Sequence, residues 1–397
     1  MAKKVAIVGG GASGLICAIF CAKAGLNVEL FEQNTKLAKK ILVSGNGRCN
    51  IINREFTSAN YISSNPEFVN YALKQFDFHA FESFVNSLGL LLEQKADGKC
   101  YPLSNEAKSV AKLFEESAKN NGVHITQDTK IENIQKLLNS YDAVVIATGS
   151  EAASHLGGNR DGMNFAESLG HTVMPTYPTL VQLHLDSPSA YKMAGAKVDG
   201  EVSLLINREL LSQIKGDVLF TNYGVSGFSI LDISSRASEA LLNFETVEIS
   251  INLLPNFPAQ KLAAHIQNIA KLNPSLHLID VLVGLLPVKI VKALLEELEL
   301  SFDLCGEAIG TKLTKKIANK LVNWRFHVSD THGFRHAEAS GGGVNTHEIN
   351  PKTMESLLVR NLYFVGEVVD VVGERGGYNF AWAWASGVLA AKSISKE

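Results

Sequence analysis

Three glycines near the start of the chain have the spacing of a phosphate-binding loop. Gly9, Gly11 and Gly14 follow an apolar run at residues 5–8 and precede a second apolar run at residues 15–24. In a strand–turn–helix unit, the first glycine makes the turn, the second lets a pyrophosphate approach the backbone, and the third lets the helix pack closely on the sheet. The N–H groups at the start of the helix favour an anion. We therefore expect these residues to contact a dinucleotide: Gly9, Gly11, Ala12, Ser13 and Gly14.

A carboxylate follows this loop at the distance expected of a ribose ligand. Glu32 lies 18 residues beyond Gly14, at the end of an apolar segment at residues 28–31, and Gly25 ends the intervening helix. A carboxylate at this place accepts hydrogen bonds from the ribose hydroxyls and repels a 2′-phosphate. Strand, glycine loop, helix, strand and acid within about 30 residues predict a dinucleotide-binding unit. A glycine-rich turn without a ligand is the alternative interpretation.

A second glycine-rich stretch combines flexibility with positive charge. Residues 39–40 are two lysines, and residues 44–50 read Ser-Gly-Asn-Gly-Arg-Cys-Asn. Glycines let a loop wrap a ligand, and lysine and arginine side chains pair with phosphate. A solvated basic loop is the alternative, but such a loop does not require these glycines. We expect the following residues to bind the ligand: Lys39, Lys40, Ser44, Gly45, Gly47, Arg48 and Asn50.

The C-terminal part of the chain resembles the opening unit. An apolar segment at residues 361–365 ends in glycine and acid, and a glycine-rich turn at residues 373–379 precedes a helix. In flavin-binding folds, a late strand delivers an acid to the ribityl chain, and the next helix N-terminus stabilises the negative charge of reduced flavin. FAD is therefore the predicted cofactor. The expected ligands here are Gly366, Glu367, Asp370, Gly376, Gly377, Tyr378 and Asn379.

The segments between these loops predict an α/β architecture. An apolar strand at residues 142–146, typical of a parallel sheet buried on both faces, leads into three further expected ligands: Ala147, Thr148 and Gly149. Ile131 lies where an adenine-contacting backbone often sits in such folds. Within residues 176–254, the segments 180–185 and 198–206 alternate in polarity and predict antiparallel strands, as does the short apolar segment 217–220. Residues 259–320 are helix-like, with breaks at Pro274 and Pro287.

Composition limits the kinds of partner. The 397 residues carry a formal net charge of −3, which gives no electrostatic reason to expect nucleic acid or an anionic membrane. Five cysteines are an odd number, which indicates reduced thiols and a cytoplasmic protein. Residues 5–22 are uncharged, but three consecutive glycines argue against a membrane helix. The sequence shows no spacing that indicates a metal site.

Several motifs in the same order resemble a known family. Beyond the loops described above, they include Gly341-Gly342-Gly343-Val344 and the segment at residues 221–227. The chain is similar to the bacterial FAD-dependent flavoproteins known as aminoacetone-oxidase-like or BaiN-like NAD(P)/FAD-dependent oxidoreductases. The resemblance implies a discontinuous Rossmann-like FAD-binding domain (1–175 and 335–397), an inserted β-barrel-like domain (176–254 and 321–334) and a helical insert (255–320). Asn222 stands where many members carry histidine.

The predicted activity is that of an FAD-dependent oxidoreductase. A small organic substrate would transfer hydride to the flavin, which carries the redox chemistry. A base would assist, and the candidates are Asn222, Tyr223, His332, His336 and Cys49; each histidine is otherwise a packing or surface residue. The alternatives are a flavin-dependent reductase that takes electrons from NAD(P)H and a flavin-dependent RNA-modifying enzyme. No second glycine-loop unit for NAD(P)H is visible, and a non-catalytic FAD-binding protein remains a further alternative.

Overall fold

The computed structural model describes residues 2–396 and divides into two compact units. Unit 1 contains Met1–Tyr177 and Glu338–Glu397, and unit 2 contains Pro178–Ala337. Unit 1 contains a parallel sheet with helices, and unit 2 contains a closed barrel of six strands. The predicted fold class, a Rossmann-like sheet with a β-barrel-like insertion, is confirmed. The predicted domain boundaries, and the separation of residues 255–320 as a helical insert, stay predictions.

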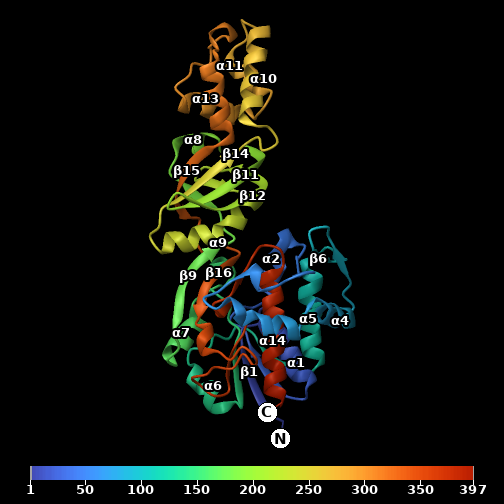
Figure 1. Cartoon of the computed structure of the whole chain (residues 1–397). Helices are drawn as coiled ribbons and strands as arrows, with labels where there is room; N and C mark the ends of the chain where they lie inside the picture. The colour runs from blue at the N-terminus through green and yellow to red at the C-terminus, as the bar shows by residue number, and fades with distance from the viewer. Residues whose placement is uncertain (1, 397) are drawn as a thin grey trace. The chain divides into compact units, whose positions relative to one another are not determined.

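The central sheet of unit 1 has the strand order β17-β8-β1-β2-β7 (Figure 1). All four neighbouring pairs are parallel, and Val5 lies opposite both Val28 and Ala143. Strands β1, β8 and β17 consist almost entirely of buried residues, as expected of a sheet covered on both faces. The strands are β1 (Lys4–Val8), β2 (Asn27–Phe31), β7 (His124–Thr126), β8 (Ala143–Ile146) and β17 (Leu362–Phe364).

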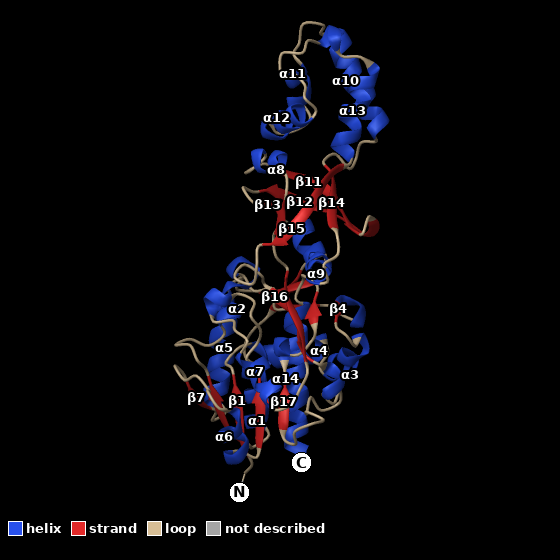
Figure 2. Cartoon of the chain, turned by 90° about the vertical axis from the view of Figure 1, so that its left-hand side faces the viewer, coloured by secondary structure: helices blue, strands red, loops and turns tan. Residues whose placement is uncertain are grey.

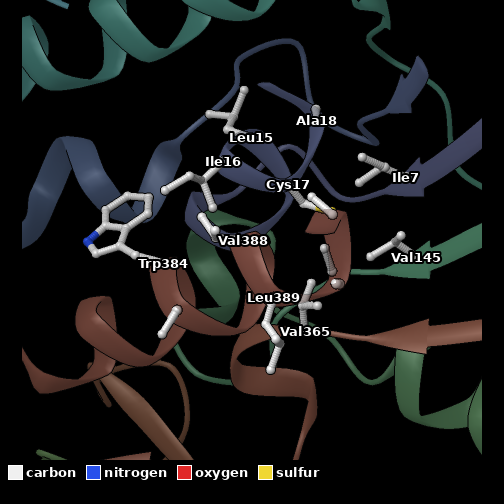
Figure 3. Packing of buried hydrophobic residues seen from close by; sticks show 14 of the residues in the cluster. Ile7, Leu15, Ile16, Cys17, Ala18, Val145, Val365, Trp384, Val388 and Leu389 are labelled. Carbon is white, nitrogen blue, oxygen red and sulfur yellow. The ribbon is translucent and has the colours of Figure 1, made fainter. Parts of the chain in front are cut away.

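Helix α1 (Ala12–Lys23) and helix α14 (Tyr378–Lys396) pack against each other and join the two ends of the chain. Figure 3 shows Leu15 and Ile16 of α1 beside Val388 and Trp384 of α14. Trp384 is fully buried, and its indole N–H donates to the Ile51 carbonyl at 2.9 Å. This apolar contact fixes the late segment 361–379 to the opening glycine loop.

The rest of unit 1 surrounds this core. Its other helices are α2 (Lys39–Gly47), α3 (Val69–Gln75), α4 (Phe78–Ser87), α5 (Ala107–Asn120), α6 (Ile134–Ser140) and α7 (Asp161–Ser168). Its short strands are β3 (Ile52–Asn53), β4 (Tyr61–Ile62), β5 (Leu92–Gln94), β6 (Lys99–Pro102), β9 (Val173–Thr179), β16 (Ala339–Val344) and β18 (Val372–Gly373). They pair as β16-β9, β18-β4 and β3-β6-β5.

The barrel of unit 2 closes in the order β10-β13-β12-β11-β14-β15, and every pair is antiparallel. Its strands are β10 (Leu183–Leu185), β11 (Lys197–Ile206), β12 (Glu209–Phe220), β13 (Gly224–Ser226), β14 (Val247–Asn252) and β15 (Trp324–Thr331). Alternate residues such as Val202, Leu204 and Ile249 are fully buried, so the period-2 pattern of the sequence builds the barrel core. Helix α9 (Phe228–Leu242) packs on β12.

The other α-helices of unit 2 can be followed in Figure 2. They are α8 (Pro188–Lys192), α10 (Ala259–Leu272), α11 (Leu278–Val283), α12 (Val288–Glu297) and α13 (Thr311–Val322). The two prolines act as predicted from sequence: α10 ends two residues before Pro274, and α12 begins directly after Pro287. Proline lacks a backbone N–H, so it stands before a helix or after one rather than inside it.

The structure differs from the sequence-based expectation in two segments. Strand β12 is twelve residues long, whereas only its last four residues were expected to form a strand. Its first half is largely exposed and has Leu210 and Leu211 side by side, so it lacks the alternation of apolar and polar residues that marks a half-buried strand. Residues 39–43 begin a helix, α2, and the expected loop conformation is found in a kink at residues 44–46 and in residues 48–50, which follow the helix.

Among residues 2–396, no helix is both long enough and apolar enough to cross a membrane.

Candidate functional site

The three glycines of the first loop meet different surroundings. A Cβ atom on Gly9 would lie 2.4 Å from the Ala147 carbonyl oxygen, and one on Gly14 would lie 1.9 Å from the Gly9 carbonyl oxygen. Close backbone contacts therefore require both glycines. A Cβ atom on Gly11 would meet nothing within 4 Å, so this side of the loop is open. The open side fits a pyrophosphate that approaches the backbone, as the sequence predicts.

The first turn of α1 has free N–H groups. Within the described chain, no side chain caps this helix, and its first turn contains no acidic residue. Ala12 and Ser13 lie at this end, and Ser13 is buried. Uncapped N–H groups and the positive end of the helix dipole favour an anion. Together with the open side of Gly11, they fit the phosphates of a dinucleotide.

Glu32 lies directly after β2 and is 7% exposed. Its Oε2 accepts the Gly10 N–H at 2.8 Å, and its Oε1 accepts the backbone and side-chain N–H groups of Asn34 at 2.8 and 2.6 Å. A carboxylate offers about four acceptor positions, so these bonds hold Glu32 beside the loop and leave capacity for a ribose hydroxyl. Lys39 donates to the Asn34 side-chain oxygen at 2.7 Å, which places it in the same network.

Lys40 and Glu367, two predicted cofactor ligands, form an ion pair with each other at 2.6 Å. The other oxygen of Glu367 accepts the Ser340 N–H at 2.8 Å. Gly366 has a φ of +73°, and a Cβ atom on it would lie 2.5 Å from the Ser13 hydroxyl oxygen. The late acid is therefore held beside the early glycine loop. Asp370 is buried, and its Oδ2 accepts the Ser64 N–H at 2.9 Å.

The start of α14 depends on two glycines. Gly376 and Gly377 have φ values of +141° and +96°, and a Cβ atom on Gly377 would lie 2.5 Å from the Ile52 carbonyl carbon. Asn379 exchanges two hydrogen bonds with the Gly373 backbone, at 2.7 and 2.9 Å. The Tyr378 carbonyl accepts the Tyr61 hydroxyl at 3.0 Å. The turn is thereby fixed against strands β3 and β4.

The second glycine-rich stretch is partly occupied by its own contacts. Ser44 donates to the Ile41 carbonyl, and Gly45 and Gly47 have positive φ values. Arg48 donates to the Gly45 carbonyl at 3.3 Å, and its guanidinium lies 5.3 Å from the Tyr101 ring centre. In the orientation that points its side-chain oxygen at Gly377, Asn50 accepts the backbone N–H of Gly377 at 3.2 Å. Asn50 therefore links this stretch to the start of α14.

Cys49 is buried and has a φ of +61°. Burial raises its pKa to about 12, although the Ser44 hydroxyl acts in the opposite direction. At neutral pH the thiol stays protonated, and the thiolate is the nucleophilic form of cysteine. This environment argues against a redox or catalytic role for Cys49 and favours a packing role.

The remaining predicted ligands lie at the carboxyl end of β8 and beside β7. Ala147 donates its N–H to the Val8 carbonyl at 2.8 Å, and Gly149 has a φ of +75° with open space beyond. The Thr148 hydroxyl is buried without a hydrogen-bond partner among the described residues and points at Gly162. Ile131 lines a cavity of about 600 Å³. These places are at the edge where doubly wound sheets bind ligands.

Unit 2 contains a separate cluster of aromatic and titratable side chains. The His184 Nε2 lies 2.8 Å from the His332 Nδ1, and the Tyr223 ring stacks on His332 with centroids 4.1 Å apart. The His336 ring centroid lies 4.2 Å from that of His332. We call these four residues the histidine cluster. Asn222 is exposed, and no hydrogen bond to its side chain is found within residues 2–396.

Strand pairing explains how the histidine cluster forms. In the barrel, β10 lies between β13 and β15, and His184 is opposite both Gly224 and Asp330. Tyr223 precedes β13 and His332 follows β15, so closure of the barrel brings them to His184. Sequence reasoning missed His184. Its signal was the alternation Leu183-His184-Leu185, in which both leucines are fully buried and the histidine between them is not.

Partial burial and neighbouring histidines favour the neutral form of His332. Partial burial, and then repulsion from His336 and His184 when they are protonated, lower its pKa below the ordinary value. A neutral imidazole can accept a proton at one nitrogen while the other makes a hydrogen bond. Among residues 2–396, no group of three or more histidine, cysteine or acidic side chains is arranged to hold a metal.

Comparison with known proteins gives full-length relatives. A 3-dehydro-bile acid delta(4,6)-reductase from Clostridium scindens is 32% identical, with 99% of each chain covered. Two ribosomal RNA dihydrouridine synthases, from Haemophilus influenzae and Escherichia coli, are 31% and 32% identical; 98% of this chain is covered in each case, with 98% and 97% of those proteins. The family model described as the HI0933-like protein Rossmann domain matches residues 3–393. These matches confirm the resemblance to BaiN-like flavoproteins, and the chain belongs to the HI0933-like family.

Proposed function

We propose that this chain, an FAD-dependent oxidoreductase, reduces a carbon–carbon double bond that is conjugated to a carbonyl group. The observation that carries this proposal is the set of full-length relatives. One is named as a delta(4,6)-reductase of a 3-dehydro-bile acid, and two are named as dihydrouridine synthases. The bond reduced in a 3-oxo steroid of this kind and the C5–C6 bond of uracil are both conjugated to a carbonyl. One chemistry therefore accounts for both names.

This proposal reverses the direction that the sequence analysis favours. There, an organic substrate transfers hydride to the flavin, whereas reductase-named relatives support hydride transfer to the substrate. Reduction of the double bond consumes two electrons and two protons. Both electrons and one of the protons arrive together as a hydride at the carbon β to the carbonyl, and the second proton is added to the α carbon. The electrons need a donor, and we propose a reduced nicotinamide dinucleotide, as in the first alternative drawn from the sequence.

Unit 1 supplies the residues that we propose to hold FAD. The open side of Gly11 and the uncapped start of α1 suit the pyrophosphate. Glu32 is held by Gly10 and Asn34 in a position to accept a ribose hydroxyl. Bound FAD would supply the hydride chemistry. Lys40 and Glu367 neutralise each other and keep the late acid beside Ser13 without an unpaired buried charge.

We propose His332 as the residue that exchanges the substrate proton. Its hydrogen bond to His184 fixes one ring nitrogen, and its stacking on Tyr223 fixes the ring plane. A histidine kept neutral in this way can take up and release a proton near neutral pH. Asn222, Tyr223 and His336 remain candidates for a supporting role in this step.

The test uses purified protein reconstituted with FAD. Anaerobic samples receive NADH or NADPH together with one of two substrates, a 3-oxo-4,6-diene steroid or a uridine-containing RNA, and mass spectrometry detects products that have gained two hydrogens. Reduction of either substrate with matching consumption of the nicotinamide supports the proposal. Bleaching of the flavin by amines or ketones, with neither conjugated substrate reduced, would contradict it and return the direction to substrate oxidation.

The variant His332→Gln is made in the same protein. We expect FAD content to stay unchanged and turnover to fall by a factor of about 10²–10⁴, the usual contribution of a general acid–base residue. His347→Gln, an exposed histidine in unit 1, is the matched control. Equal turnover in His332→Gln and the control would remove His332 from the proposal while leaving the reductase activity itself intact.

A further inference from the structure

Helices α10 and α13 of unit 2 are rich in lysine and contain no acidic residue. Helix α10 carries two lysines, helix α13 carries four, and neither contains aspartate or glutamate. The whole chain, in contrast, has more acidic than basic residues, 40 against 37. The acidic residues of the segment 255–320 are grouped elsewhere, between residues 280 and 307. Positive charge is therefore concentrated on α10 and α13.

Most of these lysines have no ionic partner. Lys320 pairs with Glu297 and lies over the Trp324 ring, so it serves the fold. The other five are exposed, and none of them makes an ion pair with any carboxylate of residues 2–396. They are Lys261, Lys271, Lys312, Lys315 and Lys316. We call these five residues the lysine face.

Helices α10 and α13 pack together through other residues, and the lysine face remains exposed. Leu262 and Ala263 of α10 meet Ala318 of α13, and the Gln267 side chain donates to the Thr311 hydroxyl at 2.7 Å. Both figures that show the whole chain place α10 beside α13. The inner sides hold the pair together, and the lysines take no part in that contact.

On α13 the lysines repel one another. Lys312 and Lys316 are four residues apart on one helix, and Lys315 adjoins them, so like charges are neighbours on the helix surface and repel each other. Repulsion of this kind is relieved when a polyanion binds and its counterions are released. The lysine face therefore fits a ligand with several negative charges.

We propose that the lysine face is a docking surface for RNA, in which the five lysines contact backbone phosphates. This inference rests on the proposed function, because it selects uracil in RNA over a free steroid as the substrate class. Lysine contacts of this kind add affinity without sequence preference. The residue to be reduced would then be chosen elsewhere in the protein, and the lysine face would supply the electrostatic part of binding.

An anionic membrane is the competing polyanion, and the exposed side chains disfavour it. A helix that lies in a membrane surface presents large apolar residues beside its lysines. The exposed residues between the lysines are instead small or polar, such as Ala264, Asn268 and Asn319. The exposed apolar residues Phe257 and Leu272 lie before and at the end of α10, not between its lysines.

Fluorescence anisotropy with a labelled uridine-containing RNA hairpin tests the surface. The variant Lys312→Glu/Lys315→Glu/Lys316→Glu should weaken binding by on the order of tenfold or more, and should lower the dependence of log K on log salt by about 2, at roughly 0.7 per phosphate contact. The milder variant with glutamine at the same three positions should show a smaller loss. FAD content and reduction of the small conjugated steroid should be unchanged in both.

A matched control separates local contact from total charge. Lys74, Lys108 and Lys112 are exposed lysines on α3 and α5, and their conversion to glutamate changes the net charge equally. The proposal would be overturned if RNA affinity fell as much in this control as in the α13 variant. It would also be overturned if the protein bound phosphatidylglycerol vesicles more tightly than RNA. RNA binding through the lysine face, with neither its uridines nor the steroid reduced, would support the docking surface and contradict the proposed function. Steroid reduction by a protein that does not bind RNA would support the proposed function and contradict the docking surface.

Discussion

The glycine loop of unit 1 and the histidine cluster of unit 2 are built in opposite ways. The loop lies within residues 9–14. Nearby backbone leaves no room for a side chain at Gly9 or Gly14, whereas the space beside Gly11 is open. The histidine cluster joins His184, Tyr223 and His332, which come from three segments and meet only because β10 pairs with β13 and with β15. One site follows from spacing along the chain, and the other follows from strand register.

This difference determines how each site can fail. A single added methyl group can close the glycine loop, because the surrounding backbone has no room to move. The histidine cluster tolerates a change at one ring more easily, but it depends on register: a slip of one residue in β10 would turn His184 to the barrel interior. Predictions on the loop therefore concern folding and cofactor binding, whereas predictions on the cluster concern protons.

The largest effect is expected for Gly14→Ala. The new Cβ atom would lie 1.9 Å from the Gly9 carbonyl oxygen, so the start of α1 must move away from the turn. We expect a loss of about 1–3 kcal/mol in the free energy of unfolding, the usual range for overpacking, together with loss of FAD. Thermal melts and the flavin absorbance of purified protein measure the two effects.

Gly11→Ala is the matched control for that prediction. Its Cβ atom would meet no protein atom within 4 Å, so stability should stay within about 0.5 kcal/mol of the original. FAD binding should nevertheless weaken, because the methyl group occupies the side that we assign to the pyrophosphate. Equal destabilisation by both variants would show that packing alone explains the loop glycines; full FAD affinity in Gly11→Ala would place the pyrophosphate elsewhere.

A smaller effect is expected for Glu32→Ala. Its carboxylate would give a ribose hydroxyl a charge-assisted hydrogen bond worth about 1.5–3 kcal/mol, so FAD affinity should fall about 10- to 100-fold. The structure adds that Glu32 also accepts N–H groups of Gly10 and Asn34, so some stability should be lost as well. Glu32→Gln keeps a hydrogen-bond acceptor, so it should lose less FAD affinity and less stability than Glu32→Ala. Titration of apoprotein with FAD checks the series, and unchanged affinity in Glu32→Ala would exclude Glu32 as the ribose ligand.

The sequence predicted the fold class and the glycine loop because both depend on local signals. Apolar runs such as residues 5–8 and 143–146 mark buried parallel strands, and glycines mark the turns after them. Other features depend on distant partners and were missed. His184 looks like an ordinary strand residue until β15 is placed beside it, and the apolar residues in the first half of β12 do not alternate with polar ones.

The lysine face shows a different limit of sequence reasoning. The net charge of −3 averages over the whole chain and predicted no nucleic acid. Residues 261 and 312 are far apart in sequence, so only the packing of α10 against α13 reveals that their lysines lie on two neighbouring helices, neither of which contains an acidic residue. Net charge says little about partners when opposite charges are separated in space.

The smallest effect concerns protonation in the histidine cluster. The pKa of His332 is lowered by partial burial and by the charges of His336 and His184. Above the ordinary histidine pKa of about 6.5, folded and unfolded chains both hold His332 neutral, and its titration costs no stability. As the pH falls below that value, the unfolded chain gains a proton that the folded chain resists. The free energy of unfolding should therefore decrease until the pH passes the lowered pKa of the folded state.

The variant His336→Gln should raise the pKa of His332, because it removes one like charge whose ring lies 4.2 Å away while the His184 hydrogen bond remains. The shift should be small, since burial is the larger cause of the lowered pKa and is nearly unchanged. NMR titration of the histidine ring protons measures it, and His347→Gln in unit 1 is the control that should leave the His332 titration unaltered. If His336→Gln also left it unaltered, the two rings would not interact electrostatically, and the cluster would be a packing contact between aromatic rings. The histidine cluster and the glycine loop would then differ only in how they are assembled, and no proton chemistry would be assigned to the barrel.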